Sequence, residues 1–131
     1  MKKSLIFIFA FVFVSLALQA QSIGEKWKEL KEFHSVMSQT FHPSEEGNLE
    51  PIKTRSGEMA QKAKVLAKSA IPAEFATPKI KDAVKRLNKG SQQLDKLVKS
   101  GKASDEQIKT SLAALHDVFH EIVGLCKNEN H

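Results

Sequence analysis

The chain has 131 residues, which is the size of one ordinary domain. Its 20 Lys and Arg residues outnumber 15 Asp and Glu residues, and 41% of the chain is apolar, so the composition is globular and weakly basic. A single Cys excludes an intramolecular disulfide and a cysteine-rich zinc module.

The first 20 residues have the three-part pattern of a secretory signal peptide. Two lysines follow Met1, residues 5–18 are apolar except for Ser15, and Ala20 supplies a small residue at the cut. The apolar run is short for a membrane span. We therefore predict cleavage after Ala20 and export to the periplasm or the outside of the cell. The alternative is an uncleaved anchor.

The rest of the chain predicts four helices, at about residues 23–41, 49–70, 78–99 and 105–126. Apolar or small residues recur in each at alternating steps of three and four, which is the pattern of a helix that buries one face. In the first helix this spacing selects Ile23, Trp27, Leu30, His34, Met37 and Phe41. No run alternates with a period of two, so no strand is expected.

Residues with known preferences for helix ends mark the boundaries. Ser22 with Glu25, and Ser104 with Gln107, have the spacing of capping boxes. Pro43 is expected to end the first helix, Thr77 to cap the third, and Gly101 to follow its last turn. Because the connections are short, consecutive helices should be antiparallel neighbours.

We therefore predict an all-α protein with one domain, residues 21–131, folded as an antiparallel up-down-up-down four-helix bundle after a cleavable signal peptide. The alternative architecture is a pair of helical hairpins that packs only as a homodimer.

Charge is divided unevenly along the chain. Residues 53–102 carry a net charge of +9, whereas residues 21–50 and 103–131 each carry −3. All five histidines lie in these two acidic segments. The second and third helices therefore present a basic surface, either as a solvated face or as a docking site for an anionic surface. Nucleic acid is not expected, because no aromatic residue is interleaved with these lysines and the chain is predicted to be exported.

The most suggestive chemical pattern is a pair of histidines in the fourth helix. His116 and His120 are one helical turn apart, which places both imidazoles on one face, where two nitrogens can bind one metal ion. The spacing alone is common in helices, and two surface histidines are the alternative.

A histidine of the first helix strengthens the hypothesis. His34 stands at a position where an apolar residue is expected, and an inward imidazole needs partners for its nitrogens. If the first and fourth helices are antiparallel neighbours, His34 lies at the level of His116 and His120. We predict that these three bind zinc or copper. Secondary candidate ligands are Met37, His42 and Cys126.

Two other interpretations of this region remain open. Ser56 and Ser91, with Gly57 and Gly90 beside them, interrupt the second and third helices near the same level. The histidine could then belong to a buried polar layer that fixes the register of the helices. A pocket for a larger ligand is the other interpretation.

The layout resembles secreted four-helix-bundle proteins of the b-type and c-prime cytochrome group, in architecture only. The c-prime cytochromes carry Cys-x-x-Cys-His near the C-terminus, whereas residues 126–130 read Cys-Lys-Asn-Glu-Asn, so covalent haem attachment is excluded. The b-type bundles ligate haem through a Met of the first helix and a His of the fourth. The resemblance therefore implies Met37, with His116 or His120, as ligands of a non-covalent haem b.

Catalytic signatures are absent from the sequence. It contains no glycine-rich phosphate loop, nucleophile elbow or HExxH motif, and no Glu occupies the apolar seams as a di-iron site requires. We therefore expect no enzymatic activity. The expected function is metal binding, and the alternative is a structural or chaperone-like periplasmic adaptor.

Overall fold

The computed structural model describes residues 23–128, and every long element among them is a helix. The helices are α2 (Lys28–Glu45), α3 (Glu50–Lys68), α4 (Pro78–Lys99) and α5 (Asp105–Asn128), with a short 3-10 helix, η1 (Ala73–Phe75), before α4. No strand occurs within this part of the chain, so the all-α prediction is confirmed. The predicted signal peptide, residues 1–20, lies outside the described residues, as do Ser22 and His131.

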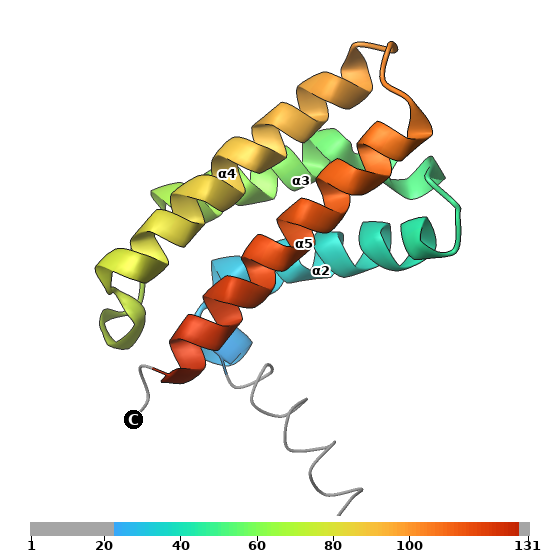
Figure 1. The fold of residues 1–131 in the computed structure, drawn as a ribbon. Helices are drawn as coiled ribbons and strands as arrows, with labels where there is room; N and C mark the ends of the chain where they lie inside the picture. Colours follow the sequence, from blue (N-terminus) through green and yellow to red (C-terminus); the bar gives the residue numbers. More distant parts are fainter. Residues whose placement is uncertain (1–22, 129–131) are drawn as a thin grey trace, which may run out of the picture.

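The four long helices form a bundle (Figure 1). Each packs against the next along the chain, and α5 also packs against α2, although less extensively. None of the helices between residues 23 and 128 is long and apolar enough to cross a membrane.

Several helix ends are as the sequence predicts. The Thr77 hydroxyl accepts a hydrogen bond from the Ile80 N–H at 3.3 Å. Ser104 and Gln107 form a reciprocal capping box, because each backbone N–H donates to the side-chain oxygen of the other, at 2.8 and 3.1 Å. Gly101 has a φ of 68°, the left-handed conformation that favours glycine after a helix.

The first helix differs from its prediction in two ways. It is interrupted at Trp27, whose φ of −130° and ψ of 86° separate a helical turn at residues 23–26 from α2. Pro43 does not end α2, which continues to Glu45. Pro43 removes only one hydrogen bond so near the end of the helix, and its carbonyl accepts from the N–H groups of Glu46 and Asn48, at 3.1 and 2.9 Å.

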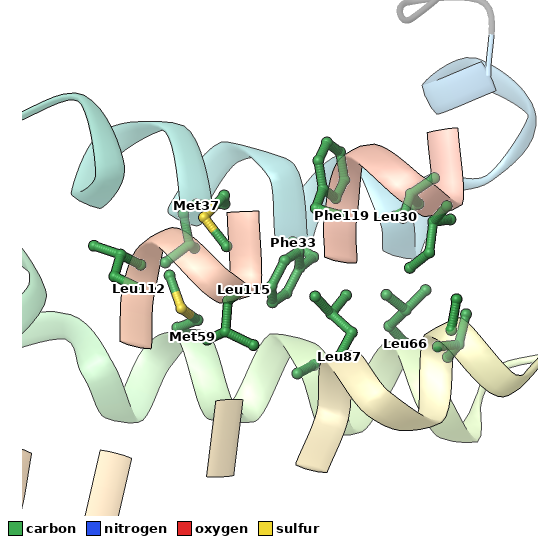
Figure 2. Close-up of a cluster of buried hydrophobic side chains, with 14 of the residues drawn as sticks. Leu30, Phe33, Met37, Met59, Leu66, Leu87, Leu112, Leu115 and Phe119 are labelled. Carbon is green, nitrogen blue, oxygen red and sulfur yellow. The ribbon is translucent and has the colours of Figure 1, made fainter. Parts of the chain in front are cut away.

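The core confirms most of the apolar spacing of α3, α4 and α5, and in the first helical segment it buries Ile23, Trp27, Leu30 and Met37 as predicted, but not His34. Phe33 is completely buried, whereas His34, which the spacing selects, is exposed. Figure 2 shows Phe33 in the middle of the core, between Met37 and Phe119. Leu30 and Met37 keep the predicted spacing, and Phe33 replaces its neighbour His34 between them. The phenyl ring takes the interior position since it gains more from burial than an imidazole does.

Candidate metal centre

His116 and His120 meet at the surface of α5. Their Nε2 atoms lie 3.1 Å apart, and the two rings are nearly perpendicular, with centroids 4.3 Å apart. This is hydrogen-bond distance, and the tautomers of the two rings decide which nitrogen donates and which accepts. The helical spacing therefore brings the pair together as the sequence predicts.

Two phenyl rings anchor histidines on the faces of α2 and α5 that meet. The ring of His116 stacks on Phe41 of α2, with centroids 3.8 Å apart and planes 10° apart. The ring of His34 stacks on Phe119 of α5 at 4.7 Å, also at 10°. Each contact crosses between the helices, so α2 and α5 orient each other's imidazoles. The spacing of the sequence does not reveal this role of the phenylalanines, although Phe119 directly precedes His120.

We call the set of four histidines on this side of the bundle, His34, His42, His116 and His120, the histidine face. Its members influence one another electrostatically. Desolvation lowers the pKa of His34 from its ordinary value, and the charges of His120 and His42 lower it further. The pKa of His116 is also lowered, first by desolvation and then by His120. Both rings therefore favour the neutral form that binds metals.

The carboxylates near the histidines are directed to other partners or act at a distance. Glu45 lies 3.6 Å from Nδ1 of His42, and Glu121 binds Arg86 of α4 at 2.8 Å. Asp117 and Glu45 oppose the lowering of the His116 pKa through their charges. The nearest ligand set consequently consists of imidazoles.

The structure brings together only part of the predicted ligand set. Met37 and Cys126 are completely buried in the apolar core, away from the exposed ring of His120. His34 is exposed beside Phe119 and does not point into the core. Between residues 23 and 128, no three His, Cys, Asp or Glu side chains converge as ligands of one ion.

The polar residues inside the bundle form a separate feature. The Ser56 hydroxyl donates to Oδ1 of Asp95 at 2.8 Å, and Lys99 binds the other carboxylate oxygen at 2.8 Å. Ser91 Oγ is buried with no hydrogen-bond partner. The polar layer therefore joins α3 to α4 and does not include His34. Asp95 was missed because its four-residue spacing to Lys99 reads as an ordinary surface ion pair.

One open groove, of about 330 Å³, lies between α4 and α5. Its walls are mostly apolar, with Arg86 as its cation. That guanidinium already binds Asp82 at 2.9 Å and Glu121 at 2.8 Å, so it is not available to an anionic ligand. The groove therefore adds no reactive group to the histidine face.

Comparisons with known proteins do not assign a function to this site, so its assignment depends on the geometry described above. No protein-family model, curated protein or solved structure matches the chain.

Proposed function

We propose that this chain is an exported protein, an antiparallel up-down-up-down four-helix bundle, that binds a zinc or copper ion through the histidine face. The signal-like pattern of residues 1–20 supports export to the periplasm or the outside of the cell. Packing between consecutive helices, short connections and the course of the chain in Figure 1 support the topology.

The observation that carries the metal proposal is the separation of the His116 and His120 Nε2 atoms, 3.1 Å. Two nitrogen ligands of a tetrahedral zinc ion, each about 2.0–2.1 Å from the metal, lie about 3.3 Å from each other. The distance between the pair thus already matches that of two ligands of one ion, and binding would replace any proton shared between them. The stack of Phe41 on His116 reduces the motion of one ring, which lowers the entropic cost of binding.

His34 is the best placed third ligand. Its ring lies on Phe119, the residue before His120, and the charge of His120 lowers its pKa. Rotation of the exposed His34 side chain towards His120 would complete a three-imidazole set, with water in the remaining position. Imidazole nitrogens suit zinc and copper, which sets the expected selectivity against magnesium and calcium.

Calorimetric titration of the full chain with Zn²⁺ and Cu²⁺ tests this function. We expect one ion per chain, with binding lost in His116→Ala and His120→Ala and weakened several-fold in His34→Ala. His42→Ala is the matched control, because His42 is on the same face but beside Glu45. Equal affinity in all four variants would refute the site. An absorption band of haem in the purified protein would instead favour the haem b alternative.

Thermal unfolding provides a second measurement. An ion at 100 times its Kd stabilises the folded state by about 2.7 kcal/mol, so a chelator should lower the Tm of the metal-loaded wild type but not of His116→Ala. If the wild type takes up no metal and ignores the chelator, the structural adaptor becomes the better function. The hydrogen bond from Ser56 to Asp95, which fixes the α3–α4 register, is the observation that favours that alternative.

A further inference from the structure

Six lysines with free charges occupy the outer side of α3 and α4. We call them the lysine face: Lys64, Lys68, Lys81, Lys85, Lys89 and Lys96. All six are exposed. None takes part in an ion pair within the part of the chain that the structure describes, whereas the lysines at positions 53, 62 and 99 are paired with acidic residues.

Hydrogen bonds between α3 and α4 fix where these lysines stand. Ser56 binds Asp95, and the Gln92 side chain donates to the Ala60 carbonyl at 2.8 Å. Moving forward along α3 therefore corresponds to moving backward along α4. Lys64 and Lys68 follow Ala60 by one and two turns of α3. They therefore lie beside the first half of α4, which carries Lys81, Lys85 and Lys89. The lysine face is thus continuous across both helices.

Acidic side chains near this surface are already paired. Asp82 binds Arg86 on the side of α4 that faces α5, and Asp95 is held by Ser56 and Lys99. Most of the acidic residues lie in the segments that contain α2 and α5, which carry net negative charge. The molecule therefore has a positive side and a negative side, and its charges favour one orientation towards an anionic surface.

We propose that the lysine face docks on the surface of an anionic phospholipid bilayer. Lysines spread over two adjacent helices match a surface of many mobile negative headgroups, which needs no fixed geometry of recognition. Val65 is the one large apolar side chain that is exposed among residues 23–128, at 41%, and it adjoins Lys64 on α3. It would supply an apolar contact at the headgroup boundary beside the lysines.

Nucleic acid is the less suitable polyanion. The five Trp and Phe rings that the structure describes are buried or half-buried, and none belongs to the lysine face: Trp27, Phe33, Phe41, Phe75 and Phe119. The surface consequently offers no platform on which bases stack. It also contains no arginine, the side chain that pairs with guanine in a two-pronged way.

Sedimentation with vesicles tests the proposal. The full chain is mixed with vesicles of phosphatidylcholine and phosphatidylglycerol in a 3:1 ratio, in EDTA so that metal binding plays no part. Pure phosphatidylcholine vesicles measure the binding that the apolar residues 5–18 contribute. We expect binding to the anionic vesicles in 50 mM NaCl, weakened at least about tenfold in 300 mM NaCl because salt screens exposed charges.

A pair of charge-reversal variants locates the surface. One replaces Lys64, Lys68, Lys85 and Lys89 with Glu, and should lose about tenfold or more in affinity. The matched control replaces Lys28, Lys31, Lys109 and Lys127, exposed lysines of α2 and α5, with Glu, and should lose less than about threefold. Both variants have the same net charge, so circular dichroism need only establish that both are folded.

Four results would overturn the proposal. They are equal loss of binding in both variants, equal binding of the wild type to neutral vesicles, tighter binding to duplex DNA than to anionic vesicles, and a dimer that only the lysine-face variant abolishes. The last two would assign the surface to nucleic acid and to a second copy of the chain. All four are independent of the metal site, because the lysine face contains none of its residues.

Discussion

The α3–α4 pair and the α2–α5 pair are held together by different chemistry. Between α3 and α4, the Ser56 hydroxyl binds Asp95 and the Gln92 amide binds a backbone carbonyl, both at 2.8 Å. Between α2 and α5, three aromatic contacts are made, and two of them stack an imidazole on a phenyl ring. Side-chain hydrogen bonds thus link the first pair, and stacked aromatic rings link the second.

This difference separates the tasks that each pair can perform. Directional hydrogen bonds hold the register of α3 against α4, so their outer side can carry many like charges without rearranging. Stacked rings tolerate small shifts, and they leave the imidazole nitrogens available to a proton or a metal ion. We therefore expect chemistry at the histidine face and electrostatic docking at the lysine face.

The largest expected effect distinguishes the two adjacent residues of α2 that compete for the core. Phe33→Ala should lower the free energy of unfolding by about 3–5 kcal/mol, because it removes a completely buried ring. His34→Ala should change it by less than about 0.5 kcal/mol, since His34 is at the surface. Urea denaturation measures both. Comparable losses would contradict the orientation of α2.

The next prediction concerns the polar layer between α3 and α4. Ser56→Ala should cost about 1–2 kcal/mol, because it removes the hydroxyl that donates to the Asp95 carboxylate. Ser91→Ala is the matched control and should be neutral or stabilising by about 0.5 kcal/mol, since the buried Ser91 hydroxyl has no partner. The same urea experiment decides. A stabilising Ser56→Ala would mean that hydrogen bonding does not distinguish this helix pair.

A third prediction tests the contact between α4 and α5, which links the two pairs. A Cβ atom at Gly90 would lie 2.6 Å from Cδ2 of Leu115, so Gly90→Ala should destabilise by about 1 kcal/mol despite its better helix propensity. Nothing lies within 4 Å of a Cβ at Gly124 of α5, and Gly124→Ala should stabilise by about 0.5–1 kcal/mol. Thermal melts that shift both variants upward would show that the groove beside Leu115 absorbs the methyl group.

The smallest expected effect is a pH dependence confined to the histidine face. The pKa values of His34 and His116 are lowered on folding, so the unfolded chain binds more protons below pH 6.5. The free energy of unfolding should therefore fall as the pH drops through 6.5 and level off below the folded-state pKa values. Melts from pH 7.5 to 5.5 in EDTA measure it.

The double variant His34→Gln/His116→Gln is the control for this pH effect. It should lose most of the slope between pH 7.5 and 5.5, because the remaining carboxyl groups titrate mainly at lower pH. An unchanged slope would place the pH-sensitive groups elsewhere in the molecule.

Local signals along the sequence predicted the elements well where no tertiary contact competes with them. Thr77, Gly101 and the Ser104–Gln107 box act within one or two turns of chain, and each behaves as expected. The pairing of His116 with His120 also follows from the period of a single helix. Signal cleavage, metal identity and membrane docking stay predictions.

The sequence by itself determined the helices of this protein and the face that α3, α4 and α5 bury, because helical periodicity and end signals are local properties. Only the tertiary structure decided that Phe33 enters the core in place of His34, and that phenyl rings from opposite helices support the imidazoles. The physical reason is that the phase of α2 is set by competition for a limited interior. Phe33 and His34 are neighbours between the buried residues Leu30 and Met37, and the larger apolar ring takes the buried position.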